Sequence, residues 1–342
     1  MEAKRMINGF ARTLIDWFQI YGRELPWRQT RDPYAIWLSE IILQQTQVKQ
    51  GWDYWQRFMH RWPTVGDLAA ASEDEVLREW QGLGYYSRAR NLHFAARQIV
   101  ALGHFPNTLD EIKLLKGVGD YTAAAIASIA FGHPAAVVDG NVYRVLSRHF
   151  GIDTPINSTE GKKAFAALAQ SLMPQASGNS DENICGLYNQ AIMDFGAIQC
   201  TPQSPKCIVC PLQETCEALR KGKVNLLPVK QKTLKIRTRH LVYIYIRCQG
   251  ETAIHRRGEG DIWQGLWEPL LENTGELLDN NKMQLIAKDV KHVLTHQVLT
   301  ADFYLWETDT RPQLPSDYIW IKESDIDDYA IPRLIDILLT KL

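Results

Sequence analysis

The spacing of apolar residues changes once along this chain of 342 residues, and the change limits the folds open to it. Before about residue 220, apolar residues recur at helical spacing between glycines and prolines, which predicts an all-α domain. The expected helices cover residues 11–22, 48–62, 68–81, 87–103, 123–132, 140–151 and 161–173. Later, short β-branched and aromatic runs predict an α+β domain. Its expected strands cover residues 240–248, 253–258, 300–308 and 318–322, and its expected helices cover 282–294 and 331–342.

A basic segment separates the two patterns. Residues 220–239 carry eight basic residues and no acidic one, although the whole chain has a net charge of −1. A solvated linker has this composition, and so does a strap along a phosphate backbone. The chain lacks an apolar run of membrane-spanning length, and MEAKRMINGF does not read as a signal peptide. We therefore expect a soluble intracellular protein with no membrane partner.

Glu40 stands among apolar residues in WLSEIILQQTQV, residues 37–48. At helical spacing its neighbours form an apolar arc with Glu40 at the edge. We expect the helix to end near Leu43, the glutamines to form a loop and Thr46 to cap the next helix. From these residues alone, Glu40 is either a structural carboxylate at the border of a core or a functional acid.

Four of the six cysteines lie close together with the spacing C-x6-C-x2-C-x5-C: Cys200, Cys207, Cys210 and Cys216. Thiols this close in an intracellular chain indicate a metal site more than disulfides. Structural zinc sites usually present two tight cysteine pairs, whereas here only Cys207 and Cys210 form one, and a proline follows Cys210 as in cluster loops. The residues themselves leave zinc and an iron–sulfur cluster open. Cys185 and Cys248 are expected to be buried core thiols.

A glycine-rich turn and a second carboxylate follow in the first domain. Gly117 and Gly119 lie between a short helix and a strongly helical run within residues 114–132. Glycines let the backbone turn tightly, so that amides at the next helix N-terminus can face an anion, although most such turns are only turns. Asp139 precedes a helix, and a helix cap needs no other function.

Six motifs occur in a fixed order: PWR, WLSE-x3-QQTQV, GLGYYSRARNL, LKGVGDYTAAAI, VDGNV and the four cysteines. Between Leu25 and Cys216 this order closely resembles the helix-hairpin-helix DNA glycosylases, specifically the adenine DNA glycosylases of the MutY type. The resemblance implies a multidomain protein, with an all-α catalytic domain over residues 1–219, the hairpin at 114–132 and the cluster loop at 200–216. A basic linker over 220–237 and a Nudix-like α+β lesion-recognition domain over 238–342 would follow. RRGEGDIWQGLWEPL and HVLTHQ carry the second match.

That family removes adenine mispaired with 8-oxoguanine, or with guanine, from duplex DNA after rotating the adenine into a pocket. By this resemblance Glu40 is the general acid that protonates adenine, because apolar neighbours raise a carboxyl pKa. Asp139 would stabilise or capture the oxocarbenium ion, which leaves an abasic site. Tyr121 and Asn141 match residues that orient this site. The adenine pocket would consist of Trp27, Arg28 and Gln190.

The resemblance also assigns the cofactor and the DNA contacts. The four cysteines would hold a 4Fe–4S cluster, and Gly117 and Gly119 would bind a DNA phosphate. Residues that wedge into the base stack or fill the vacated space would be Gln44, Gln45 and Tyr85. Thr295 and His296 match the loop that senses 8-oxoguanine, where the family commonly has phenylalanine and serine before the histidine and this chain has Leu294 and Thr295.

Three other functions compete with this interpretation. A bifunctional glycosylase and lyase of the endonuclease III type needs a Schiff-base lysine just after the hairpin, where this chain has Tyr121. A Nudix-type pyrophosphatase needs the pattern R-E-x2-E-E for magnesium, and no such run follows residue 235. A non-catalytic DNA-binding module would not need the two carboxylates. We therefore expect a monofunctional, monomeric enzyme on double-stranded DNA, cytoplasmic and associated with the nucleoid.

Overall fold

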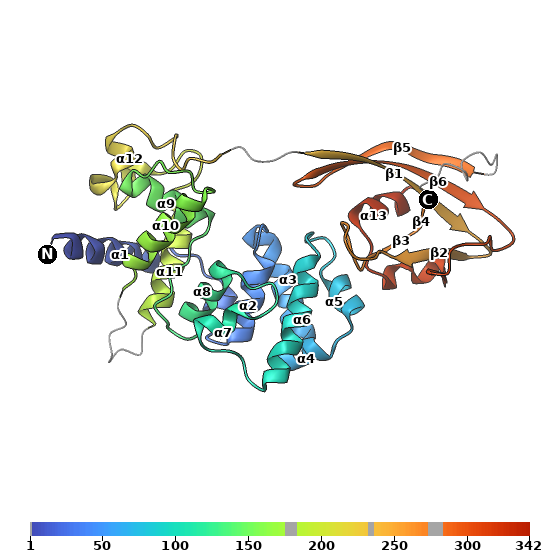
Figure 1. Cartoon of the computed structure of the whole chain (residues 1–342), viewed down its shortest axis with the longest axis horizontal. Coiled ribbons are helices and arrows are strands. Elements are labelled where there is room, and N and C mark those ends of the chain that lie inside the picture. The colour runs from blue at the N-terminus through green and yellow to red at the C-terminus, as the bar shows by residue number, and fades with distance from the viewer. Residues whose placement is uncertain (1, 175–182, 232–235, 273–282) are drawn as a thin grey trace. The chain divides into compact units, whose positions relative to one another are not determined.

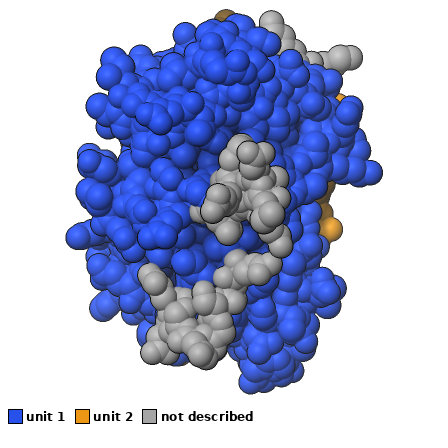
Figure 2. All heavy atoms as spheres, turned by 90° about the vertical axis from the view of Figure 1, so that its left-hand side faces the viewer, with its two compact units in different colours: residues 1–66, 94–232 blue, residues 67–93, 233–342 orange. Residues whose placement is uncertain are grey.

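A computed structural model describes residues 2–174, 183–231, 236–272 and 283–342 (Figure 1). The contacts divide the chain into two compact units (Figure 2). The first consists of Met1–Gly66 and Phe94–Lys232, and the second of Asp67–His93 and Thr233–Leu342. The domain boundaries predicted from the sequence stay a prediction, and residues 232–235 of the expected linker lie outside the described residues.

The described chain up to residue 220 is helical, and none of its helices is long and apolar enough to cross a membrane. The helices are α1 (Glu2–Tyr21), η1 (Pro26–Arg28), α2 (Pro33–Ile42), α3 (Val48–Arg61), α4 (Val65–Ala70), α5 (Glu73–Glu79), α6 (Ser87–Leu102), α7 (Leu109–Lys113), α8 (Asp120–Ile129), α9 (Gly140–Phe150), α10 (Thr159–Ser171), α11 (Ile184–Asp194), η2 (Phe195–Gln199), η3 (Cys207–Val209), η4 (Gln213–Thr215) and α12 (Glu217–Arg220). Each helix expected in this part of the chain is present. The expected helix 68–81 is two helices, because Ser72 starts α5 with a capping box to Glu75.

Helix α2 ends where the sequence predicted, but the next helix starts differently. Asp32 accepts a hydrogen bond from the Tyr34 amide at 3.0 Å and Pro33 occupies the first turn, so the start of α2 is fixed. Leu43 is its C-cap. The N-cap of α3 is Gln47 rather than Thr46, whose hydroxyl instead donates to the Gln44 carbonyl at 3.4 Å within the turn. The prediction of a Thr46 cap is therefore wrong.

Part of the basic segment is held within the first unit. The Leu227 carbonyl accepts from Arg148 Nε at 3.1 Å, and the Val229 carbonyl accepts from the Ile156 amide at 3.0 Å. The Asn157 side chain donates to the Gln231 carbonyl at 2.9 Å. Residues 227–231 are thus fixed by hydrogen bonds to their backbone carbonyls rather than freely solvated.

Over residues 236–272 and 283–342, the second unit has two sheets, one α-helix and one 3-10 helix. These elements are β1 (Arg237–Arg247), β2 (Glu251–Arg256), β3 (Trp267–Glu268), β4 (Leu270–Glu272), β5 (Met283–Val293), β6 (Gln297–Glu307), β7 (Tyr318–Lys322), η6 (Glu323–Asp328) and α13 (Arg333–Leu339). One sheet has the order β4-β1-β6-β5, with β1 and β6 parallel and the outer strands antiparallel to them. The other, antiparallel sheet has the order β3-β2-β7.

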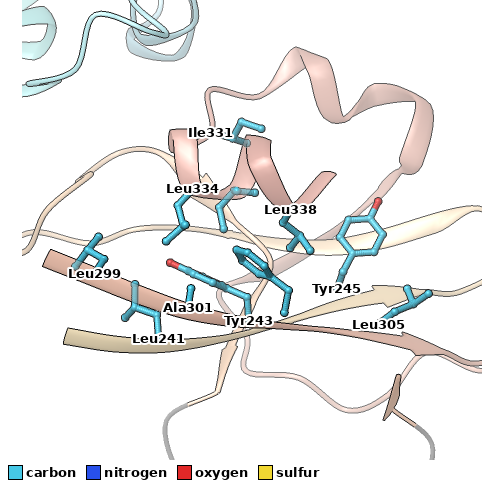
Figure 3. Packing of buried hydrophobic residues seen from close by; sticks show 11 residues of the cluster. Leu241, Tyr243, Tyr245, Leu299, Ala301, Leu305, Ile331, Leu334 and Leu338 are labelled. Atoms are coloured by element: carbon cyan, nitrogen blue, oxygen red, sulfur yellow. The ribbon is translucent and has the colours of Figure 1, made fainter. Parts of the chain in front are cut away.

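Alternation along β1 determines which residues enter each core. Leu241, Tyr243 and Tyr245 point to the face covered by α13, where Leu334 and Leu338 pack on them (Figure 3). The intervening Ile244 and Ile246 pack on the opposite face. This two-residue period is that of a strand buried on both faces. The strands expected at 240–248, 253–258, 300–308 and 318–322 and the C-terminal helix are all present.

The expectation of a helix over residues 282–294 is wrong, because residues 283–293 form strand β5. The register of β5 against β6 shifts between Leu285 and Ala287 and again between Ala287 and Val290. Asp289 has a φ of +52°, and its amide donates to the Asp302 carboxylate at 2.7 Å. Each bulge adds a residue and breaks the two-residue period. The apolar residues therefore fall at three- and four-residue intervals, which imitates a helix.

Within the second unit, Asp67–His93 contacts the C-terminal segment through polar side chains. Arg256 contacts Glu73 at 2.9 Å, and Arg90 donates to the Gln264 side chain at 3.1 Å. Gly265 has a φ of +81°, and a Cβ there would lie 3.3 Å from Leu77. A glycine suits both this backbone conformation and the close packing.

Candidate active site

Glu40 lies near the end of α2, a helix with almost every side chain buried. Only 9% of Glu40 is exposed. Burial raises its pKa to about 7; the Tyr121 hydroxyl and the Arg28 guanidinium oppose this rise, and the nearby Asp139 adds to it. A carboxyl group with this pKa is partly protonated at neutral pH and can act as a general acid.

Tyr121 stands in the first turn of α8, just after the glycine turn. Its hydroxyl lies within hydrogen-bonding reach of the Glu40 carboxyl and 3.2 Å from Met193 Sδ. The carboxylate is the stronger acceptor, so we assign the proton to that bond. Burial, together with the two carboxylates, raises the pKa of Tyr121 well above its usual value. Tyr121 is therefore a neutral hydrogen-bond donor to Glu40.

Asp139 is the N-cap of α9, and its carboxylate is held on both oxygens. One oxygen accepts from the Val142 amide at 2.8 Å, and the other accepts from the Asn141 side chain at 2.8 Å. Burial raises the pKa of Asp139, while these hydrogen bonds and Arg144 lower it. The cap expected from the sequence is confirmed. The Asp139 side chain therefore caps α9 and also lies in the same cavity as Glu40.

Asn141 is itself fixed by two neighbours. Its side-chain oxygen accepts from Arg144 at 2.8 Å, and Arg144 also donates to the Gly196 carbonyl at 2.6 Å and to the Cys200 carbonyl at 2.7 Å. A Cβ on Gly196 would lie 2.6 Å from the Asn141 Cβ, so only glycine fits. Gly196 belongs to η2, a π-helical turn, and such turns often occur at functional sites.

One cavity of about 950 Å³ in the first unit contains these groups. It is large enough for a nucleoside, and small-molecule sites commonly fall in this size range. The structure brings together all the predicted catalytic and adenine-pocket residues and two of the predicted DNA contacts: Glu40, Asp139, Tyr121, Asn141, Trp27, Arg28, Gln190, Gln44 and Gln45. Trp27 lies in η1 and packs edge-on against Trp52 and Trp55, with ring centroids 5.9 and 5.7 Å away.

The other predicted DNA-facing residues do not line this cavity. Gly117 has a φ of +79° in the turn between α7 and α8, and Gly119 is the N-cap of α8 in extended conformation. In the second unit, the Tyr85 hydroxyl is hydrogen-bonded to the Thr295 hydroxyl. The neighbouring His296 is exposed. Gln45 and Tyr85 both have a positive φ, +56° and +47°, a conformation that residues other than glycine rarely adopt.

The sequence analysis missed several residues of the site. Arg23, Arg144 and Met193 line the cavity, and Asp194 lies behind it as the last residue of α11. Asp194 had a signal that could have been used, because it is a single carboxylate in the apolar stretch AIMDFGAI. The same reasoning that selected Glu40 applies to it. Nothing in the sequence pairs Asp194 with Arg23 and Arg28 across more than 160 positions.

Cys200 ends η2, Cys207 begins η3, and Cys210 and Cys216 are the C-caps of η3 and η4; all four are free thiols. They line one small cavity together with Arg148, which donates to Cys200 Sγ at 3.4 Å. In the described part of the chain, no group of three or more His, Cys, Asp or Glu side chains is arranged as the ligands of one metal ion. Burial and the neighbouring thiols raise the pKa of Cys210 to about 11. By residue type alone, four cysteines around one cavity without a carboxylate or imidazole are a donor set that iron–sulfur clusters and zinc both use.

Comparison with known proteins identifies the family. A family model described as "HhH-GPD superfamily base excision DNA repair protein" matches residues 38–174, and one described as "NUDIX domain" matches residues 242–341. The adenine DNA glycosylase of Buchnera aphidicola subsp. Baizongia pistaciae is 31% identical over 349 residues, which cover 97% of this chain and 96% of that protein. This chain belongs to the adenine DNA glycosylase family. The family resemblance and the fold class predicted from the sequence are confirmed.

In some other relatives, only part of the protein matches this chain. The adenine DNA glycosylase of Rattus norvegicus is 44% identical over 236 residues, which cover 65% of this chain and 44% of the rat protein. The chain thus spans less than half the length of this mammalian relative. Among solved structures, one titled "Structure of a thermostable thymine-DNA glycosylase" is 32% identical, with a TM-score of 0.58 over 65% of this chain and 100% of that one. Membership of the adenine DNA glycosylase family does not favour the alternative of an endonuclease III-type lyase.

Proposed function

We propose that this protein excises adenine mispaired with 8-oxoguanine or guanine from duplex DNA by hydrolysis of the N-glycosidic bond. The observation that carries the proposal is the pairing of Glu40, with a pKa of about 7, and Asp139 in one cavity of about 950 Å³. Two carboxyl groups in different environments can divide acid and charge-stabilising roles in glycosyl transfer.

The residues of the cavity supply the steps. Adenine rotates out of the duplex into the cavity, and Glu40 transfers its proton to a ring nitrogen of the base. The bond between C1′ and the base then breaks, neutral adenine leaves, and the Asp139 carboxylate opposes the positive charge on the sugar. Water adds its hydroxyl to C1′ and returns a proton to the carboxylates, which leaves an abasic site. Tyr121 and Asn141 hold the two carboxyl groups in place.

Discrimination of 8-oxoguanine belongs to the same proposal. Thr295 and His296 lie in the exposed turn between β5 and β6, and Tyr85 contacts Thr295. We assign these three residues to the base opposite adenine. Substitution His296→Ala should reduce the preference for 8-oxoguanine over guanine and leave the rate of excision at saturating enzyme nearly unchanged.

The proposed cofactor is a 4Fe–4S cluster held by Cys200, Cys207, Cys210 and Cys216. When bound, the cluster would join the ends of the loop 200–216 and add stability to the fold. Purified protein should be yellow-brown with a broad visible absorption and about four iron atoms per chain, measured by elemental analysis. Colourless protein that contains zinc and keeps full activity would contradict this assignment.

The test of the function is single-turnover cleavage with the full chain and matched duplexes. Adenine opposite 8-oxoguanine should be released, adenine opposite thymine should stay intact, and the same duplex with thymine glycol should not be cut. Release of thymine glycol without adenine would replace the proposal with an endonuclease III-type function.

A further inference from the structure

Asp194 is a carboxylate beside the cavity whose side chain is not exposed at all. It belongs to α11 and immediately precedes the π-helical turn η2. Its oxygens accept from Arg28 Nη1 and Nη2, both at 2.8 Å, and from the Arg23 amide and Nε at 2.9 and 3.0 Å. Burial alone would raise the pKa of Asp194, but the two arginines hold it at about 2. Asp194 is therefore ionised at neutral pH.

Arg28 is the partner that faces the chemistry. It lines the cavity with Glu40, and its charge lowers the pKa of Glu40. Both of its terminal nitrogens are held by Asp194, Nη1 also donates to the Arg23 carbonyl at 2.9 Å, and the Phe18 ring lies 5.2 Å from its guanidinium carbon. A bidentate pair of this kind fixes the orientation of the guanidinium as well as its position.

Glu40 needs this restraint because of the charges around it. Tyr121 from α8, Asp139 at the start of α9 and Arg28 from η1 act on its carboxyl, and Arg23 and Arg144 line the same cavity. An arginine free to move in a buried cavity would pair with the nearest carboxylates. Pairing with Glu40 would favour its ionised form and remove the proton needed for catalysis.

We propose that Asp194 is a positioning residue that holds the Arg28 guanidinium at the cavity wall and so keeps Glu40 available as a protonated acid. The inference rests on the proposed role of Glu40. Asp194 does not contact the reacting atoms in this proposal. It acts through Arg28, and the effect of its loss should depend on pH.

The test is the pH dependence of single-turnover adenine release by the full chain. In wild-type protein the rate should fall as the pH rises through the pKa of Glu40. Asp194→Asn should move this alkaline limb down by about one pH unit or more, equivalent to a tenfold lower protonated fraction of Glu40 above the limb. The matched control is Asp16→Asn. It removes an exposed ion pair, in which Arg12 Nε lies 3.9 Å from the Asp16 carboxylate, and should leave the pH–rate profile unchanged.

A second variant tests the same proposal if Asp194→Asn alone does not fold. Arg23, Arg28 and Asp194 together carry a net charge of +1, and the double variant Asp194→Asn with Arg23→Gln keeps this charge while freeing Arg28. Its alkaline limb should shift in the same direction. Circular dichroism establishes which variants are folded.

Two results would overturn the proposal. One is an alkaline limb at the wild-type position in either folded variant, even with a lower rate at every pH. The other is loss of folding in both variants, which would make Asp194 a residue of the fold alone. Neither bears on the proposed function, whose failure would be the absence of adenine release by wild-type protein.

Discussion

A single buried carboxyl group, Glu40, connects the sequence to the chemistry. The sequence places it at the edge of an apolar helix, and the structure adds three groups that shift its pKa further: Tyr121, Asp139 and Arg28. Burial has the largest effect, which explains why a residue could be selected from its apolar neighbours alone. The hydrogen bond from Tyr121 and the charge of Asp139 come from segments about 80 to 100 positions away, and no local pattern predicts them.

Glu40 should make the stability of the protein depend on pH. Its pKa is raised from 4.5 to about 7 in the folded state, so the folded protein binds the proton more tightly. The stability that this proton contributes is present below pH 4.5 and is lost as the pH rises to about 7, on the order of 3 kcal/mol. Glu40→Gln should remove this dependence. Its free energy of unfolding, compared with that of wild type, should therefore be more favourable at pH 8 than at pH 5.

Urea unfolding of both proteins at the two pH values measures this difference. The matched control is Glu160→Gln, which changes an exposed glutamate in the first turn of α10. If the free energies of unfolding of wild type and Glu40→Gln differ by the same amount at pH 5 and at pH 8, Glu40 titrates normally.

At the scale of the element, Asp139 combines a helix cap with a proposed charge-stabilising role, and two substitutions separate these. Asparagine caps a helix about as well as aspartate, so Asp139→Asn should keep the thermal stability of the protein. Asp139→Ala removes the cap as well and should cost about 1 kcal/mol. Both should abolish most adenine release. Wild-type activity in Asp139→Asn would show that the carboxylate serves only as a cap.

The elements that the sequence predicted are those with an uninterrupted period. Helices α6 and α9 and strands β1 and β6 keep one spacing throughout, so their type was predictable. Strand β5 was not, because its bulges around Ala287 and Val290 replace alternation with helical spacing. The π-helical turn after Asp194 also has no sequence signal, since it depends on Gly196 packing against Asn141.

At the scale of the molecule, the resemblance supplied what local patterns could not. Residues from η1, α2, α8, α9 and α11 meet in one cavity, and only the complete fold brings them together. Likewise, residues 67–93 belong to the same compact unit as the C-terminal segment, and no change of composition in the sequence indicates this grouping. Assignments of residues to adenine, to 8-oxoguanine and to the cluster stay proposals.

The whole enzyme should release adenine without cutting the DNA strand. Strand cleavage needs an amine that forms an imine with C1′ of the sugar. By the family resemblance, Tyr121 would stand where endonuclease III-type enzymes have their lysine, and Tyr143 where some adenine glycosylases have a lysine after the catalytic aspartate. Borohydride should therefore trap little covalent complex, and the abasic strand should break only after heating with alkali. Trapping that disappears in Asp139→Asn would show that another lysine reaches the sugar.

The most direct test of the account compares wild type with Glu40→Gln in single-turnover release of adenine opposite 8-oxoguanine, at saturating enzyme and neutral pH. The amide keeps the shape of the side chain but has no proton to transfer, so binding of the duplex should persist. Release should slow by about a hundredfold or more, as expected for loss of a general acid. Glu160→Gln, measured beside it, should retain the wild-type rate. Release by Glu40→Gln at the wild-type rate would show that this buried carboxyl group is structural, and the proposed mechanism would be wrong.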